Sequence, residues 1–234
     1  MSSPSGSPPD VGVVVVAAGS GLRAGPGEPK QFRPILGVPL LLRALRPFTS
    51  HPAVTQVVVT LPAGVPERPP EWLARLGGER LTLVTGGASR AASVKAGLAA
   101  LTPRAQIVLV HDAARPFVSR ETIDAVITRA RAGVGAAAAV PVNDTIKEVG
   151  ATNQVARTVA REGLWRAQTP QGFPREMLEE AYGRLNGALP PTDDAEVCER
   201  AGFPVEVVAD SAQNFKVTTA EDFRIAEALA REWR

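Results

Sequence analysis

Residues 11–19 read VGVVVVAAG, and this stretch decides the fold. A continuous run of small and β-branched apolar residues that ends at a glycine is typical of a strand buried on both faces of a parallel sheet. Ligands of parallel sheets bind beyond the carboxyl ends of the strands. We therefore predict a buried strand over 11–18 and a first candidate binding loop at Gly19.

The rest of the chain alternates strand patterns with helix patterns. We predict further strands over 56–61, 81–85, 107–111, 136–140, 205–208 and 215–217. Helices are predicted over 40–48, 89–101, 119–132 and from Thr219, where Thr219 and Asp222 form a capping pattern. This alternation predicts an α/β fold, Rossmann-like and three-layered, with a mostly parallel twisted sheet covered by helices on both faces.

Residues 143–160 interrupt this alternation. Thr145, Lys147, Val155, Arg157 and Val159 alternate around a turn at 150–153, which predicts a protruding β-hairpin. An isolated hairpin is marginally stable in water, so we expect this arm to pack on a partner and to form a homodimer by arm exchange. We expect a disordered tail over 1–10, rich in Ser and Pro, and a single domain over 11–234.

The composition excludes several classes of protein. The 234-residue chain has a formal net charge of +2, one cysteine and two histidines. One cysteine excludes an intrachain disulfide and a cysteine-rich zinc site, and two histidines argue against a multi-histidine metal centre. The charge balance indicates no nucleic-acid surface, and no apolar run is long enough to cross a membrane. We expect a cytoplasmic protein.

The loop after the first strand combines glycines with cations. Gly19 and Gly21 would let backbone N–H groups approach phosphates, and Arg23 and Lys30 offer the charge that a triphosphate needs. The spacing also fits a dinucleotide fingerprint, but no Asp or Glu lies between Glu28 and Glu67 to bind a ribose. No Walker-A pattern occurs. Solvated loop cations remain the simple alternative.

Seven segments together resemble a known family. They are AAGSGLRAGPGEPKQF (17–32), GGASRAASVKAGL (86–98), VHDAARPF (110–117), PVNDTIKEV (141–149), LWRAQTPQGF (164–173), TDDAEVC (192–198) and NFKVTTAEDF (214–223). The family is 2-C-methyl-D-erythritol 4-phosphate cytidylyltransferase, of the non-mevalonate isoprenoid pathway. The resemblance implies a Mg²⁺-dependent transfer of a cytidylyl group from CTP to methylerythritol phosphate with release of pyrophosphate.

The resemblance also implies roles for matching positions. Four cations would be catalytic: Arg23, Lys30, Arg161 and Lys216. Small residues would frame the nucleotide: Ala17, Ala18, Gly19, Gly21, Gly86 and Ser93. The acceptor substrate would contact Asp112, Arg115, Thr145, Thr169 and Thr192, with Thr145 and Arg161 coming from the other subunit. Asp112 could face either the metal or a substrate hydroxyl, and the metal ligands are unassigned. Three alanines depart from acidic residues common in the family: Ala88, Ala92 and Ala160.

The chemistry is consistent with these residue types. The attacking group is already an anionic phosphate, so no general base is needed and His111 is expected to be a hydrogen-bonded strand-end residue. Asp193 and Asp194 fit a metal pair, but a helix N-cap is at least as good an interpretation. Two other functions stay open. A related nucleotidyltransferase could use another sugar or alditol phosphate, and a non-catalytic nucleotide-binding module would lack Arg23, Lys30 or Lys216.

Overall fold

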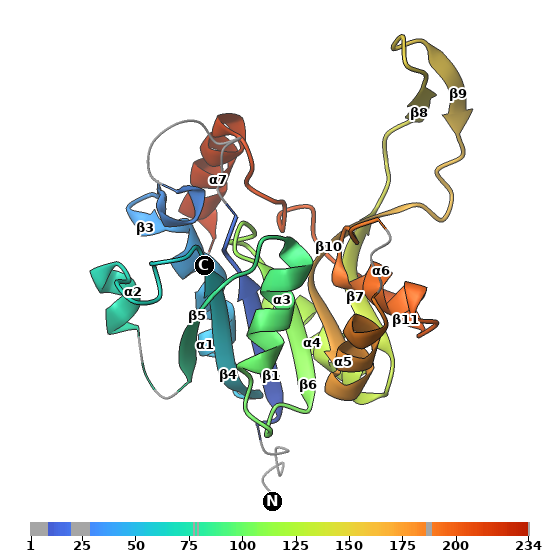
Figure 1. Ribbon diagram of the computed structural model, residues 1–234. Helices are drawn as coiled ribbons and strands as arrows, with labels where there is room; N and C mark the ends of the chain where they lie inside the picture. Colours follow the sequence, from blue (N-terminus) through green and yellow to red (C-terminus); the bar gives the residue numbers. More distant parts are fainter. Residues whose placement is uncertain (1–8, 20–28, 77, 79, 186–188, 234) are drawn as a thin grey trace, which may run out of the picture.

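The structure is a computed structural model that describes residues 9–19, 29–76, 78, 80–185 and 189–233. Its main sheet has the strand order β11-β7-β10-β6-β1-β4-β5 (Figure 1). The strands are β1 (Val11–Val16), β4 (Val54–Leu61), β5 (Leu81–Thr85), β6 (Ile107–Asp112), β7 (Gly135–Pro141), β10 (Trp165–Pro174) and β11 (Val205–Ala209). The strand predicted at 11–18 is observed over Val11–Val16, where it lies inside the sheet between β6 and β4 and is buried over Val11–Val15.

The sheet is mostly parallel, as predicted. β1 pairs in parallel with both β4 and β6, and β10 is antiparallel to its neighbours β6 and β7. Because β1 and β6 end side by side, with Val16 opposite Asp112, their carboxyl ends open onto one edge of the sheet. This is the edge where ligands of such sheets bind.

Helices cover both faces of the sheet (Figure 1). One apolar cluster joins the sheet to α1 (Leu40–Thr49) and α4 (Arg120–Arg131), and also includes Leu73 of the short α2 (Glu71–Arg75). The cluster on the other face joins the sheet to α3 (Arg90–Ala99), α5 (Arg175–Arg184) and α6 (Asp194–Arg200). Burial of these two apolar faces makes the predicted three layers.

A smaller cluster holds the C-terminal helix α7 (Ala220–Glu232). Ile35, Leu40, Phe117, Val217 and Ala226 are its buried members. Short elements frame it: the 3₁₀ turn η2 (Lys30–Phe32) and the strands β2 (Pro34–Ile35) and β3 (Val38–Pro39). α7 begins at Thr219 with the predicted capping box, in which Thr219 and Asp222 cap each other's backbone.

The predicted strand at 215–217 is wrong. Residues 215–218 have no regular secondary structure, and the Val217 N–H donates to the carbonyl of Ala114, in the loop after β6, at 2.8 Å. Phe215 and Val217 are apolar because they pack in the cluster around Phe117, not because they lie in a sheet. The segment crosses the end of β6, which places Lys216 over the sheet edge.

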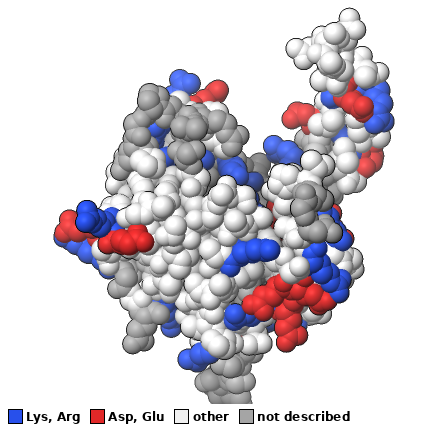
Figure 2. Space-filling model, in the orientation of Figure 1, with Lys and Arg blue, Asp and Glu red and all other residues white. Residues whose placement is uncertain are grey.

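The predicted arm is present as a hairpin of β8 (Ile146–Val149) and β9 (Val155–Val159). It projects away from the body of the molecule (Figure 1). Both signs of charge are mixed along it (Figure 2), and Val149 and Val155 are more than half exposed. Such apolar residues on a two-stranded ribbon favour a partner that covers them.

The expected N-terminal tail overlaps the described chain at its end. Residues 1–8 lie outside the described residues, and Asp10 donates its N–H to Ala53 at 3.1 Å and pairs with Arg131. In the part of the chain that the structure describes, no helix is both long and apolar enough to cross a bilayer.

Candidate active site

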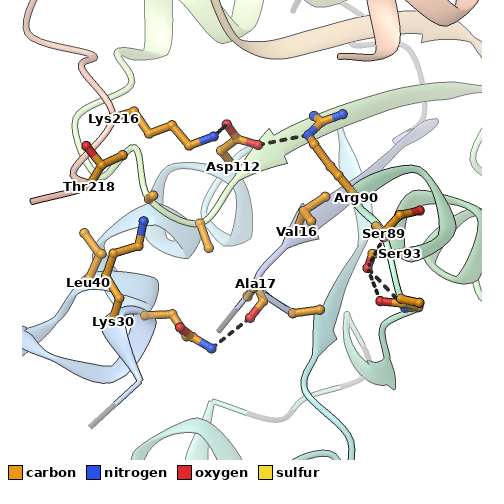
Figure 3. A pocket seen from close by; sticks show the side chains of 17 residues that line it. Val16, Ala17, Lys30, Leu40, Ser89, Arg90, Ser93, Asp112, Lys216 and Thr218 are labelled. Atoms are coloured by element: carbon orange, nitrogen blue, oxygen red, sulfur yellow. Dashed lines mark hydrogen bonds and ion pairs between the residues drawn. The ribbon is translucent and has the colours of Figure 1, made fainter. Parts of the chain in front are cut away.

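A cavity of about 720 Å³ opens at the carboxyl ends of β1 and β6 (Figure 3). Three segments line most of it: Val16 to Gly19 after β1, Gly87 to Arg90 at the start of α3, and Asp112 to Ala114 after β6. Lys30, Gln31, Leu40, Ser93, Lys216 and Thr218 complete the wall. The predicted binding loop thus begins in a real cavity. Gly21 and Arg23 lie outside the described residues.

The wall beside Ala18 depends on Gly86. A Cβ atom at Gly86 would lie 2.3 Å from the Ala18 Cβ and 2.9 Å from the Ser93 hydroxyl oxygen. Only glycine therefore lets these two segments approach so closely. Gln31 fixes the opposite side, because its side-chain amide donates to the Ala17 carbonyl at 2.9 Å.

Ser93 shapes the loop instead of pointing a free hydroxyl at the cavity. Its oxygen accepts a hydrogen bond from the Gly87 N–H at 3.1 Å, and its hydroxyl donates to the Ser89 carbonyl at 2.9 Å. Ser89 in turn caps α3 through the Ala92 N–H. These bonds hold the segment from Gly87 to Ser89, which lines the cavity.

Two lysines line the cavity, and Figure 3 shows both on the same side of it, with Lys216 above Lys30. Lys30 donates from its Nζ to the Val217 carbonyl at 2.9 Å. The Lys216 Nζ lies 2.8 Å from the Asp112 Oδ2 atom. The structure thus brings two of the predicted catalytic cations into one wall, from segments that are far apart in the sequence.

Asp112 is the centre of an ionic cluster. Beyond Lys216, its carboxylate lies 3.4 Å from the Arg90 Nε and 3.9 Å from the Arg115 Nε. Burial by itself raises the pKa of Asp112, but Lys216 and then Arg90 outweigh it and hold the pKa well below its usual range. Asp112 is therefore ionised throughout the physiological pH range.

Arg90 was not among the predicted site residues, although it lies within the quoted segment 86–98. Its Nη2 group donates to the Asp194 carboxylate at 2.7 Å, and Asp194 also accepts from the Tyr182 hydroxyl at 2.6 Å. Burial opposes the charge of Arg90, but Asp194 and Asp112 raise its pKa above the usual value. The sequence offered two signals for Arg90: its place in the segment 86–98 and its positive charge.

A second cavity of about 240 Å³ adjoins the first. Arg115, Thr169 and Thr192 line it, as the resemblance implies, together with Gln168, Gln171 and Asp193. Arg90, Asp112 and Lys216 belong to the walls of both cavities. These three residues form a partition of net positive charge between the two cavities. Such a partition suits two anionic groups that must react with each other.

His111 holds residues beside this partition in place through hydrogen bonds. Its Nε2 donates to the Arg115 carbonyl at 3.0 Å, and its Nδ1 accepts from the Thr169 hydroxyl at 3.0 Å. The Thr169 oxygen accepts from the Asp112 N–H at 3.0 Å. These bonds require a neutral imidazole, and burial lowers the pKa of His111 to about 4. The expectation of a hydrogen-bonded strand-end histidine is confirmed.

The entry to α6 is built by capping. Asp193 accepts from the Glu196 N–H, so this aspartate caps the helix as one of the two interpretations had it. The Gln171 side chain accepts from the Asp194 and Ala195 N–H groups at 2.9 Å and donates to Asp193 at 2.9 Å. Thr192 is held beside this turn through its contacts with Glu196.

Thr145 and Arg161 line neither cavity of the single chain. Thr145 is exposed, and Arg161 is exposed and donates to the Asn143 carbonyl at the base of the arm. The structure thus separates these two predicted residues from the cavity cations. Ala88 does line the first cavity, whereas Ala160 lies on the exposed arm side.

A protein-family comparison decides between the open interpretations. The family model described as IspD: 2-C-methyl-D-erythritol 4-phosphate cytidylyltransferase matches residues 11–232. The chain belongs to this family. The match covers both cavities, the partition between them and the arm, so the resemblance drawn from seven short segments holds for nearly the whole chain.

Individual relatives agree with the family match. A 2-C-methyl-D-erythritol 4-phosphate cytidylyltransferase from Salinibacter ruber is 42% identical over 227 residues, covering 95% of this chain and 93% of that protein. The bifunctional enzyme IspD/IspF from Caulobacter vibrioides is 47% identical over 220 residues, covering 93% of this chain. The chain spans 56% of the length of that bifunctional relative.

Solved structures share the fold. The 2-C-methyl-D-erythritol 4-phosphate cytidylyltransferase from Thermus thermophilus has a TM-score of 0.80 and 38% identity, covering 95% of this chain and 99% of that one. The 4-diphosphocytidyl-2C-methyl-D-erythritol synthase from Anaerococcus prevotii has a TM-score of 0.82 and 27% identity, covering 94% and 96%. The IspD fold is therefore the fold of this chain.

Proposed function

We propose that the chain transfers a cytidylyl group from CTP to 2-C-methyl-D-erythritol 4-phosphate, giving 4-diphosphocytidyl-2-C-methyl-D-erythritol and pyrophosphate. An oxygen of the acceptor phosphate attacks the α-phosphorus of CTP in line, and the bond from that phosphorus to the leaving pyrophosphate breaks. The observation that carries the proposal is the cationic partition of Arg90, Asp112 and Lys216 between two adjoining cavities. In a family member, such a partition suits the meeting of two phosphates.

The larger cavity holds the nucleotide in this proposal. Ala17, Ala18 and Gly19 line this cavity. Together with Gly21 and Gly86, they offer backbone groups to the base, ribose and phosphates, and Ser93 keeps the loop from Gly87 to Ser89 in place. Lys30, with Arg23, counters the negative charge that grows on the α-phosphate and on the departing pyrophosphate. Cations fixed before the reaction stabilise this transition state more than the ground state.

The smaller cavity holds the acceptor. Lys216 and Arg115 attract its phosphate, and Thr169, Thr192 and Asp112 border the space for the polyol. Because the phosphate is already an anion, positioning and charge neutralisation replace general-base catalysis. Thr145 and Arg161 complete the acceptor site from a second copy of the chain, so the active form is a homodimer joined through the arm at 143–160.

A Mg²⁺ ion fits the residues present. Mg²⁺ is usually bound by one or two carboxylates together with substrate phosphates. Asp112 supplies one carboxylate to the wall that the two cavities share. Within the described residues, no group of three or more His, Cys, Asp or Glu side chains could hold a metal alone. Asp112 and the nucleotide phosphates would therefore hold the ion, which supplies charge neutralisation.

The proposal is tested by pyrophosphate release from purified protein with Mg²⁺ and methylerythritol phosphate, comparing CTP with ATP, GTP and UTP. We expect release that is confined to CTP and requires the acceptor. Release with another alditol phosphate, and none with methylerythritol phosphate, contradicts the proposed acceptor. Binding of CTP without release from any acceptor points to a binding module. The cytoplasmic location, the single domain over 11–234 and the lack of a nucleic-acid partner stay predictions.

A further inference from the structure

Arg90 occupies an unusual position for a residue with no assigned role. It is the first residue of α3 and belongs to the walls of both cavities. Its side chain is 24% exposed, whereas its partner Asp194 is fully buried. In Figure 3 the Arg90 side chain extends over the cavity toward Asp112, from the side opposite Lys216. A charged side chain so placed must serve either the fold or the site.

A buried anchor fixes the far end of Arg90. Asp194 receives hydrogen bonds from the Arg90 Nη2 at 2.7 Å and from the Tyr182 hydroxyl at 2.6 Å, one on each carboxylate oxygen. Burial raises the pKa of Asp194, and the charge of Arg90 opposes that rise. The Asp194 backbone is held too, because its N–H donates to Gln171 at 2.9 Å. Arg90 is therefore fastened by three elements, α5, α6 and β10.

At the near end of Arg90, the two oxygen atoms of the Asp112 carboxylate have different partners. The Arg90 Nε faces the Oδ1 atom at 3.4 Å, while Lys216 and Arg115 face the Oδ2 atom at 2.8 and 3.9 Å. Lys216 thus shares one carboxylate oxygen and is 40% exposed toward the cavities. If Arg90 released Oδ1, both oxygens could turn to Lys216, because an ammonium ion has three donors.

We propose that Arg90 is a positioning residue that holds Asp112 by one oxygen, so that Lys216 stays available to the phosphate of the acceptor. Asp194 and Tyr182 set the place of Arg90. The inference rests on the proposed function and deepens it, because it names the group that keeps an internal carboxylate from competing with the substrate for the same lysine. Asp112 and the acceptor phosphate are both anions, so each weakens the other's hold on Lys216.

The first test is Arg90→Met, which keeps an unbranched but shorter side chain and removes its charge. We expect the KM for methylerythritol phosphate to rise about tenfold or more and the KM for CTP to stay within about twofold. Arg129→Met is the matched control, because Arg129 is an exposed arginine with one carboxylate partner, Glu206, and lines neither cavity. We expect it to leave both constants unchanged. Equal rises in both constants for Arg90→Met would mean that Arg90 grips the nucleotide, and would overturn the proposal.

A double variant separates positioning from folding. Arg90→Met leaves the Asp194 carboxylate buried without its cation, which can unfold the protein. Arg90→Met with Asp194→Asn removes that buried charge, and an asparagine oxygen can still accept from Tyr182. We expect the double variant to regain the thermal stability of the wild type and to keep the raised KM for the acceptor. Recovery of the acceptor KM together with stability would show a structural role only and would overturn the proposal.

The same comparison can be made without turnover. Titration calorimetry of methylerythritol phosphate against the wild type and the double variant measures acceptor affinity directly, and we expect it to weaken by the same factor as the KM rises. If the wild type releases no pyrophosphate, the proposed function fails. If the wild type releases pyrophosphate and the double variant matches it in acceptor KM and affinity, the role of Arg90 fails alone.

Discussion

The body and the arm of the molecule each carry predicted site cations, but they hold them differently. In the body, Lys216 lies 2.8 Å from Asp112, whose carboxylate also lies 3.4 Å from Arg90 and 3.9 Å from Arg115. On the arm, both side chains of the pair Arg157 and Glu148 are more than half exposed, and Arg161 donates to the Asn143 carbonyl at the arm's own base. The cations of the body are arranged before any substrate arrives. Those of the arm gain a fixed environment only if another copy of the chain supplies it.

Among substitutions in the body, replacement of Lys216 should have the largest effect on turnover. Lys216→Met should lower the turnover number for pyrophosphate release by about 10³-fold, because the transition state loses a fixed cation beside the attacking phosphate. The protein should stay folded, since Arg90 and Arg115 still neutralise Asp112. Steady-state kinetics, with circular dichroism as a check of folding, measures both.

A lysine-to-methionine substitution on the arm provides the comparison with Lys216→Met. Lys147 is exposed and donates from its Nζ to the Thr158 hydroxyl across the hairpin. Lys147→Met should leave turnover within about twofold of the wild type, because surface contacts of this kind contribute little. Turnover of folded Lys216→Met close to that of the wild type would remove this lysine from the catalytic set.

Mixing two inactive variants tests whether the arm serves a second copy. Arg161→Ala and Lys216→Met should each be nearly inactive alone. If Arg161 acts in the partner's site, random exchange of chains gives heterodimers for about half of the dimers, each with one complete site, so about a quarter of the wild-type activity returns. Replacing Arg161→Ala in the mixture by a chain that carries both substitutions should restore nothing. Activity that fails to return in the first mixture contradicts arm exchange.

Much of the fold was predictable because the strands of the body are apolar and evenly separated. The patterns at 11–18, 81–85 and 107–111 lie within about two residues of the observed strands β1, β5 and β6. β10 gave no such pattern, because Pro170 and Gly172 in the same ten residues argue against a strand. The ladder to β7 does slip there, between Ala167 and Gln171. The strand expected at 215–217 failed because burial in a loop cluster gives the same short apolar run.

The site was predictable where the type of residue itself indicates its chemical role. Lys216 and Asp112 stand in segments that the resemblance singled out, and the structure places them in contact. Arg90 and Asp194 were in quoted segments too, yet nothing in their spacing shows that residues 104 positions apart form a buried pair. Such a pair depends on how α3 and α6 pack, which local patterns do not contain.

Acid should lower the stability of the body of the molecule, because the body contains a buried neutral histidine. The unfolded chain protonates a histidine near pH 6.5, whereas burial lowers the pKa of His111 in the folded state to about 4. Between these values the unfolded state binds the extra proton, so the free energy of unfolding should fall as the pH falls, by up to about 1.4 kcal/mol per unit. His111→Phe should reduce this slope, because a phenyl ring can still pack on Phe48 and does not titrate.

Urea denaturation at several pH values, followed by tryptophan fluorescence, measures the slope. His51 is the control, since burial lowers its pKa as well but a hydrogen bond to Asp124 opposes the shift. His51→Phe should therefore remove a smaller part of the slope than His111→Phe. An unchanged slope in His111→Phe would mean that the partition takes up a proton without loss of stability, contrary to the bonds that His111 makes with Thr169 and Arg115.

The smallest expected effect comes from an ion pair of the arm. Arg157 and Glu148 face each other across the hairpin, and both side chains are more than half exposed. An exposed pair gains little because water screens it and two long side chains lose freedom, so Glu148→Gln should change the free energy of unfolding by less than about 0.5 kcal/mol. Urea denaturation at neutral pH measures this. A loss well above about 1 kcal/mol would show that the pair is enclosed in the dimer, which would give the arm a buried ionic contact of the kind that the body already has.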